Sequence, residues 1–196
     1  MHGYKDSVDA LLLASGFSRR FGSGNKLLVP FRGKPLARHI LELVSSLNCF
    51  DRIFFVAAEE GVISLAQGLP VTVIRNDRAE QGQGESIRRG VAASGAAYYM
   101  FFPCDQPLLD ADTIFSLLNV RGTGRIVQPA FKGAPGTPAI FSNTFREELL
   151  SLAPGEHPRD IKGRHQTAVI TVDLASPMPL LDIDDPEMLE KMSRFR

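Results

Sequence analysis

Residues 8–27, VDALLLASGFSRRFGSGNKL, decide the fold, because they join an almost wholly apolar run to a glycine-rich loop. An apolar run such as VDALLLA at 8–14 is typical of a strand that is buried on both faces of a parallel sheet. The loop after it holds three glycines and two arginines and reaches Lys26. Glycine lets backbone N–H groups approach a ligand closely, so a loop of this kind after a strand indicates a phosphate-binding site.

Short β-branched or aromatic runs alternate with amphipathic segments along the rest of the chain. Strands are expected over residues 8–14, 52–58, 71–76 and 97–102, near 125–130 and 137–141, and over 167–173. Helices are expected over 35–48 with Pro35 as first residue, over 85–96, near 110–119 and 143–152, and after Pro186. The alternation implies βαβ units, and we predict an α/β fold, a three-layer α/β/α sandwich with a mostly parallel, Rossmann-like sheet.

The composition bounds the class of protein. The chain has 196 residues, 44% of them hydrophobic, and no repeat or linker divides it, so we expect a single domain over residues 1–196. Its 22 basic residues balance 22 acidic ones, which gives no support for nonspecific binding to nucleic acid. Cys49 and Cys104 are too few for a disulfide framework or a zinc site. No segment predicts a signal peptide or a membrane span, and we expect a cytoplasmic protein.

Ligands of a parallel sheet bind beyond the carboxyl ends of its strands. The loops expected there are 14–34, 76–86, 103–110, 131–138 and 181–187. The first loop does not fit the Walker pattern, because Asn25 and Leu27 flank the lysine where glycine and a hydroxyl residue are needed. Leu27 and Ile87 also stand where the dinucleotide fingerprint needs its third glycine. The loop therefore remains either a polyphosphate site, through Arg20 and Lys26, or a surface loop with solvated cations.

Several ordered segments together resemble one family. LASGFSRRFGSGNKLL at 13–28 resembles the signature L-A-A-G-x-S-x-R-M-G-x-x-K-x-L-L of the MobA-like nucleotidyltransferases. The segments NDRAEQGQGESIRRG at 76–90, CDQPLL at 104–109 and LDIDDPEML at 181–189 are similar to its N-x-x-x-x-x-G-x-x-x-S-x-R-x-G, G-D-x-P and D-I-D-T-P-E-D-L segments. GAPGTPAIFS at 133–142 resembles its acceptor-side G-x-P stretch. The likeness spans residues 8 to 190 and is greatest to the molybdenum cofactor cytidylyltransferase branch.

The resemblance implies a fold of the nucleotide-diphospho-sugar transferase type and a transfer reaction that depends on Mg²⁺. It implies catalytic roles for Arg20, Lys26 and Asp105, with Arg20 and Lys26 on the triphosphate. The nucleotide-binding residues that it implies are Leu13, Ala14, Ser15, Gly16, Ser18, Arg20, Lys26, Asn76 and Ser86. The metal ligands that it implies are Asp105 together with Asp182 or Asp184.

The chemistry of these residue types agrees with the implied roles. In-line attack on an α-phosphorus asks the protein for positioning and charge neutralisation, and Mg²⁺ prefers carboxylate and phosphate oxygens. Asp105 follows an apolar strand, which places it at a carboxyl end, although a carboxylate there can also cap the next turn. The DIDD run can likewise cap a helix at Pro186, and both roles can hold together.

Other polar residues carry weaker signals. Cys104 is expected to pack, His39 to be structural, and the four histidines share no ligand spacing. Arg88 and Arg89 either reach phosphate or form ion pairs on a helix surface. The remaining basic cluster either meets an anionic acceptor or is solvated; it comprises Arg159, Lys162 and Arg164.

Three departures from the family pattern bear on specificity. Ser15 stands where alanine is typical of cytidylyl transfer and glycine of guanylyl transfer, which favours CTP. Cys104 replaces a glycine of the metal loop. Glu156, His157 and Pro158 interrupt a G-D-x-G-x-R run and leave the acceptor open.

We therefore predict a nucleotidyltransferase that moves a nucleoside monophosphate, with CTP favoured, to the terminal phosphate of a molybdopterin-type acceptor. A molybdoenzyme that receives the product is a further expected partner. The alternatives are guanylyl transfer, transfer to a sugar or alcohol phosphate, and a non-catalytic carrier of molybdenum cofactor.

Overall fold

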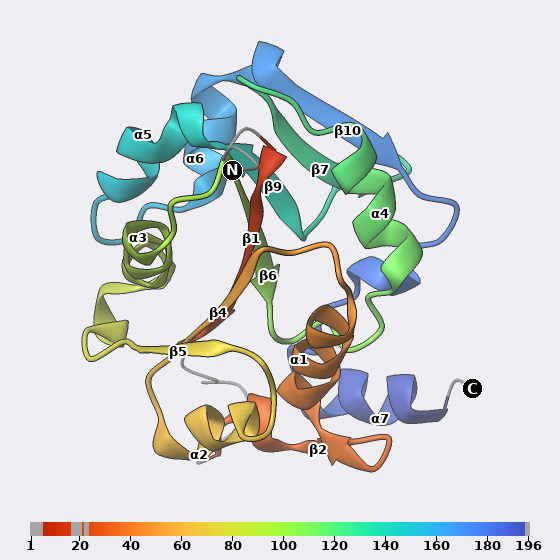
Figure 1. The fold of residues 1–196 in the computed structure, drawn as a ribbon. Coiled ribbons are helices and arrows are strands. Elements are labelled where there is room, and N and C mark those ends of the chain that lie inside the picture. Colours follow the sequence, from red (N-terminus) through yellow and green to blue (C-terminus); the bar gives the residue numbers. More distant parts are fainter. Residues whose placement is uncertain (1–5, 17–20, 22–23, 195–196) are drawn as a thin grey trace.

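The computed structural model describes residues 6–16, 21 and 24–194. Within them an eight-stranded sheet has the order β10-β7-β9-β6-β1-β4-β5, and β8 pairs with β7 beside this path (Figure 1). The strands are β1 (Val8–Ala14), β4 (Arg52–Ala57), β5 (Thr72–Arg75), β6 (Tyr98–Pro103), β7 (Ile126–Phe131), β8 (Ala134–Pro135), β9 (Ala139–Ser142) and β10 (Val169–Asp173). β1 is parallel to β4 and β6, β4 to β5, and β7 to β10, whereas β9 is antiparallel to β6 and β7. The prediction of a mostly parallel sheet is confirmed.

Helices cover both faces of the sheet (Figure 1). On one face lie α1 (Leu36–Ser46) and α4 (Ala111–Asn119), and on the other lie α3 (Gln83–Ala93), α5 (Arg146–Leu150) and α6 (Pro158–Arg164). The short α2 (Glu60–Ile63) lies near the β5 edge, and α7 (Pro186–Arg194) lies near α1 and the hairpin of β2 (Pro30–Phe31) and β3 (Lys34–Pro35). This arrangement confirms the predicted three-layer sandwich.

Successive residues of the central strands belong to two separate cores. Leu12 of β1 packs in the cluster that includes Ile40 of α1 and Ile114 of α4, whereas Leu11 packs in the cluster with Ile87 of α3. Both leucines are fully buried, because neighbouring side chains of a strand point to opposite faces and each face carries a helical layer. The apolar run at 8–14 is therefore a buried strand, as its composition predicts.

The expected elements differ from the structure mainly around the short ones. Pro35 lies just before α1, because it pairs with Pro30 in the β2–β3 hairpin and keeps an extended backbone. The helix expected near 143–152 is divided into a 3₁₀ turn, Asn143–Phe145, and α5. The sequence did not predict the two short helices, α2 and α6.

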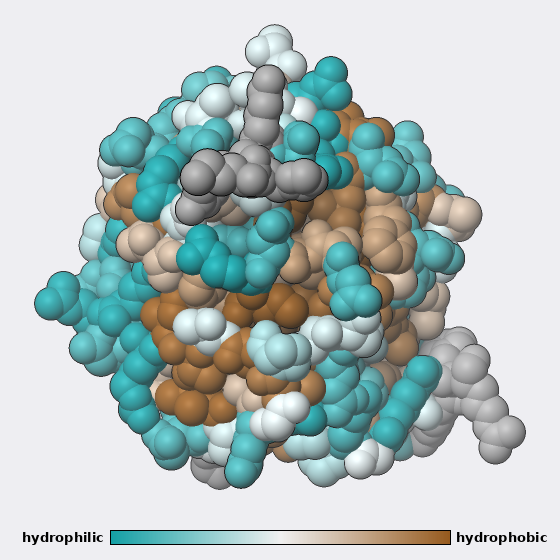
Figure 2. Space-filling view, in the orientation of Figure 1, coloured by the Kyte–Doolittle hydropathy of each residue, from teal (hydrophilic) through white to brown (hydrophobic). Residues whose placement is uncertain are grey.

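Figure 2 shows one face of the molecule in the orientation of Figure 1, with hydrophobic surface in its lower half, where β5 and α2 lie in Figure 1. Val73 of the edge strand β5 is 40% exposed. Among the described residues, no helix is long and apolar enough to cross a membrane.

Candidate active site

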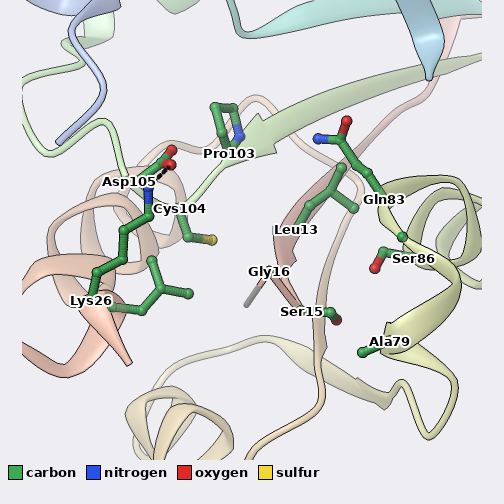
Figure 3. A pocket seen from close by; sticks show the side chains of 12 residues that line it. Leu13, Ser15, Gly16, Lys26, Ala79, Gln83, Ser86, Pro103, Cys104 and Asp105 are labelled. Carbon is green, nitrogen blue, oxygen red and sulfur yellow. Dashed lines mark hydrogen bonds and ion pairs between the residues drawn. The ribbon is translucent and has the colours of Figure 1, made fainter. Parts of the chain in front are cut away.

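Two loops leave the same edge of the sheet and frame a cavity. β1 and β6 are parallel neighbours, with Leu13 opposite Pro103, so the chain that follows each strand emerges on one side. The cavity between these loops has a volume of about 210 Å³ and opens among Leu13, Ser15, Gln83, Ser86 and Asp105 (Figure 3). The sheet edge that the ligand rule selects therefore holds a pocket.

Lys26 joins the cavity to two carboxylates from distant segments. Its Nζ donates to Oδ2 of Asp105 at 2.7 Å and to Oδ1 of Asp184 at 2.8 Å. The lysine begins a 3₁₀ turn, Lys26–Leu28, whose start is fixed because the Asn25 side chain accepts a hydrogen bond from the Leu27 N–H. Figure 3 shows the lysine and Asp105 together at one end of the cavity.

The charges of this group favour the ammonium form of the lysine. Burial by itself lowers the pKa of Lys26, but the charge and hydrogen bonds of Asp105 and Asp184 raise it above its ordinary value. Lys26 is therefore a permanent cation at neutral pH, held between two acceptors that can be exchanged for phosphate oxygens.

The C-terminal loop is attached to the loop after β6. The backbone N–H of Ile183 donates to the carbonyl of Asp105 at 2.9 Å, and the Ile183 side chain is buried. Oδ1 of Asp185 accepts from the N–H of Met188 at 2.7 Å and caps α7. Neighbouring aspartates of the acidic run therefore have different roles: Asp185 caps α7, and Asp184 pairs with Lys26.

Asp182 lies on the same loop and has a perturbed carboxyl group. The residue reaches solvent, yet partial burial by the surrounding loops and then the negative charge of Asp105 raise its pKa to about 6, while a hydrogen bond with Gln106 opposes the rise. The Gln106 side chain also donates to Oγ1 of Thr137 at 2.7 Å. A carboxylate with this pKa gains charge readily when a cation binds nearby.

The donor set fits a magnesium-like ion that is shared with phosphate. Oδ1 of Asp105 is buried and has no hydrogen-bond partner among the described residues. Those residues also contain no group of three or more His, Cys, Asp or Glu side chains arranged to hold a metal by themselves. Mg²⁺ keeps several waters and is commonly bound by one or two carboxylates and substrate phosphates, so Asp105 with one further carboxylate of the C-terminal loop, Asp182 or Asp184, stays the predicted donor set.

The opposite end of the cavity is neutral. Ser15 and Ser86 line it, and Oγ of Ser15 donates to the carbonyl of Val56 at 3.2 Å. Asn76 is buried, and its Nδ2 donates to Oγ of Ser86 at 3.0 Å. Asn76 therefore supports Ser86, while Leu13 contributes an apolar surface of the kind that a base requires.

The remaining predicted nucleotide residues are distributed as follows. Gly16 lines the cavity, and Ala14 is buried at the end of β1. Ser18 and Arg20 lie outside the described residues.

The other polar candidates are structural. Cys104 is buried, which raises the pKa of its thiol well above the ordinary value and confirms packing over reactivity. Arg88 and Arg89 both pair with Glu85, at 2.5 Å and 2.8 Å, so they form ion pairs on α3. Nε2 of His39 contacts the carbonyl of Phe31 at 2.8 Å, as expected for a structural histidine.

A second pocket, of about 350 Å³, adjoins the cavity through Leu13, Gln83 and Pro103. His157 and Pro158, from the segment that departs from the family pattern, line this pocket, and Nδ1 of His157 lies 3.2 Å from Oε1 of Gln83. Sequence reasoning missed Gln83 and Gln106, for which only their place in the loops at the sheet edge was a signal.

The predicted basic cluster divides between the pocket and the surface. Arg159 and Lys162 line the second pocket. Arg164 instead lies 3.3 Å from Glu148 and is about half exposed.

Comparison with known proteins gives a consistent family match. Residues 10–169 match the MobA-like NTP transferase domain. A solved nucleotidyl transferase from Methanothermobacter thermautotroptrophicus superposes with a TM-score of 0.84 at 20% identity, covering 96% of each chain. The fold is thereby that of the nucleotide-diphospho-sugar transferases, as predicted.

Two relatives carry different names. A molybdenum cofactor guanylyltransferase of Ectopseudomonas mendocina is 30% identical over 191 residues, covering 93% of this chain and 90% of that protein. Nicotine blue oxidoreductase of Paenarthrobacter nicotinovorans is 25% identical over 195 residues, covering 94% of this chain and 96% of that protein. The predicted cytidylyltransferase branch stays a prediction, because these matches do not distinguish it from the guanylyl branch.

Proposed function

Because the chain belongs to the MobA-like NTP transferase family, we propose that it transfers a nucleoside monophosphate from a nucleoside triphosphate to the terminal phosphate of a molybdopterin-type acceptor. The observation that carries this proposal is the ion-pair group of Lys26, Asp105 and Asp184 at the rim of a cavity. The name of the relative from Ectopseudomonas mendocina supports the choice of acceptor.

Each charged residue has a distinct task in the proposed reaction. An oxygen of the acceptor phosphate attacks the α-phosphorus, and the bond from that phosphorus to the bridging oxygen breaks to release pyrophosphate. Lys26 exchanges its carboxylate partners for phosphate oxygens and neutralises the charge that grows on the leaving group. Arg20, one of the residues outside the described part of the chain, is proposed to share this task.

Asp105 and Asp184 are the residues proposed to hold a divalent ion, for which we choose Mg²⁺. When bound, such an ion withdraws charge from phosphate oxygens and keeps the reacting groups in line. Asp105 offers an oxygen without a hydrogen-bond partner in the described part of the chain, and Asp184 is half exposed and reachable from solvent. The charges of Asp105 and Asp184 act on the Asp182 carboxyl, so an ionised Asp182 strengthens the attraction of this group for a cation.

Two observations favour different nucleotides. The relative that is 30% identical is named a guanylyltransferase, which favours GTP. Ser15 carries a side chain where the guanylyl branch typically has glycine, which favours CTP. A relative that matches nearly the whole chain is broader support than one residue, so GTP is the first nucleotide to test and CTP the second.

The decisive experiment measures pyrophosphate release from GTP, CTP, ATP and UTP with Mg²⁺, with and without molybdopterin. Sugar and alcohol phosphates serve as competing acceptors. We expect release that needs both metal and molybdopterin and that stops with Asp105→Asn.

Other outcomes of the same experiment identify the alternatives. Release of pyrophosphate with a sugar phosphate, and not with molybdopterin, would mean that the acceptor is a sugar phosphate. Binding of molybdopterin without any release would contradict the transferase and favour a carrier.

A further inference from the structure

The second pocket is a continuation of the nucleotide cavity. Leu13, Gln83 and Pro103 belong to the lining of both, and Figure 3 shows these three side chains along one side of the first cavity, with Pro103 near Asp105 and Gln83 near Ser86. A molecule seated in the second pocket therefore extends toward Asp105 and Lys26. Its volume of about 350 Å³ is within the range for a ring-sized ligand group.

The lining of the second pocket is largely apolar. Its accessible apolar residues include Leu13 and Pro103, which are half-buried, whereas Phe101 of β6 and Phe141 of β9 belong to the core and are only 5% and 0% exposed. Such a surface buries the face of a planar ring without leaving polar groups unpaired.

Two cations of α6 line this pocket, and they differ in exposure: Arg159 is exposed, whereas Lys162 is half-buried. Nζ of Lys162 donates to Oε1 of Gln128 at 2.7 Å. Gln128 lies on β7 and is only 9% exposed, so the amide is a fixed acceptor. An ammonium group has three donors, and a neutral amide satisfies one of them without balancing the charge.

The environment of Lys162 disfavours its charge unless an anion is present. Burial lowers the pKa of this lysine, and among the described residues no carboxylate forms an ion pair with it. A buried charge is costly unless it is paired. Arg164, on the same helix, does pair with a carboxylate, that of Glu148. Lys162 and Arg164 therefore differ in their surroundings, and among the described residues Lys162 has a neutral amide in place of a carboxylate.

We propose that Lys162 is the specificity-determining residue for the acceptor, and that it binds an anionic group on a planar ring system that lies against Leu13 and Pro103. This inference depends on the proposed transferase, since the terminal phosphate of such an acceptor would then reach the Lys26 cavity. The group bound by Lys162 is distinct from the phosphate that reacts. Gln83 lines both pockets, and it contacts His157 of the second one.

The test measures the affinity of the protein for pterin-6-carboxylate, a planar ring with one anionic group, through the change in fluorescence of this ligand on binding. The matched ligand is 6-methylpterin, which has the ring without the charge. Loss of a hydrogen bond to a charged group corresponds to a roughly ten- to hundredfold change in affinity. We expect Lys162→Met to weaken binding of the carboxylate by that factor, and binding of 6-methylpterin to stay within about twofold, well below the tenfold step that 1.4 kcal/mol represents.

The control variant is Arg164→Met on the same helix, which should bind the carboxylate as the unmodified protein does. Equal affinity of unmodified protein and Lys162→Met, or an equal loss in Arg164→Met, would overturn the proposal. So would failure of the unmodified protein to bind pterin-6-carboxylate at all.

Melting curves show whether each variant is folded. If Lys162→Met melts early, Lys162→Gln removes the charge while keeping a donor for Gln128, and carries the same expectation. Pyrophosphate release by the same preparations tests the transferase separately, because the pterin probe contains no phosphate. If the protein binds the probe through Lys162 but releases no pyrophosphate, the proposed Lys162 site would stand and the proposed transferase function would be wrong.

Discussion

Replacing Lys26 with methionine should make the nucleotide-free protein bind Mn²⁺ more tightly. Without nucleotide, the ammonium of Lys26 lies between the two carboxylates proposed to hold the metal, at 2.7 Å from Asp105 and 2.8 Å from Asp184. A divalent ion must displace this cation before it reaches both oxygens. The methionine side chain has similar length and no charge, so the carboxylates become available to the metal.

The size of the effect follows from the exposure of the two pairs. The side chains of Lys26 and Asp105 are 15% and 21% exposed, and a hydrogen bond between charged groups of this kind contributes about 1.5–3 kcal/mol. Asp184 is 50% exposed, so its pair with Lys26 contributes at most about 1 kcal/mol. Together the pairs oppose the metal by roughly 1.5–4 kcal/mol, which corresponds to an increase of about tenfold or more in Mn²⁺ affinity.

Isothermal titration with Mn²⁺ alone and with Mn²⁺ plus GTP or CTP measures this change. Lys26→Met should bind the bare ion more tightly and the nucleotide more weakly, because the phosphates lose their cation. Lys34→Met is the control, since Lys34 pairs with Glu42 away from the cavity and should alter neither affinity. Unchanged or weaker binding of Mn²⁺ by Lys26→Met would refute the reasoning, because it would mean that the lysine does not compete for the metal carboxylates.

Three further changes test the site and its surroundings. Asp105→Asn should lower kcat about 100-fold or more while unfolding stays cooperative, and a variant with full activity in the pyrophosphate assay would contradict the proposed metal role. The pKa of Asp182 is about 6, so its carboxyl is protonated below that pH; Mn²⁺ affinity should rise as pH increases through 6, and this dependence should vanish in Asp182→Asn. A Cβ at Gly84 would lie 3.0 Å from the backbone oxygen of Glu156, so Gly84→Ala should lower stability by about 1–3 kcal/mol in a urea titration. Gly136→Ala meets only the flexible side chain of Leu180 and should cost less; the reverse order would contradict the argument.

The central part of the fold could be predicted because its signals are local. The apolar run at 8–14 and the glycines after it predict a buried strand followed by a ligand loop, and β1 ends at Ala14 beside the cavity. Lys26, Asp105 and Asp184 stand in three different loops, and the rule for parallel sheets places all three at one edge. Their contacts follow from topology, which alternation of strands and helices already indicates.

What could not be predicted depends on contacts between side chains far apart in the sequence. Lys162 and Arg164 look equivalent in the sequence, yet one meets Gln128, 34 residues away, and the other meets Glu148. Which of them lines a pocket is decided by the position of α6 against β7. This helix has only seven residues, too few for a clear periodic pattern, so neither its presence nor its orientation could be inferred.

The position of Asp184 has a cause other than its pair with Lys26. That pair joins residues 158 positions apart and is half exposed, so it is too weak to hold the C-terminal loop. The loop is instead anchored by Ile183, which is buried in a cluster with Phe31 and Met192 and whose N–H binds the carbonyl of Asp105. Apolar burial of this kind contributes about 1.5–3 kcal/mol for each large side chain. Lys26 can therefore leave the carboxylates for a phosphate while the carboxylates keep their places, which is the property that a site exchanging one cation for another requires.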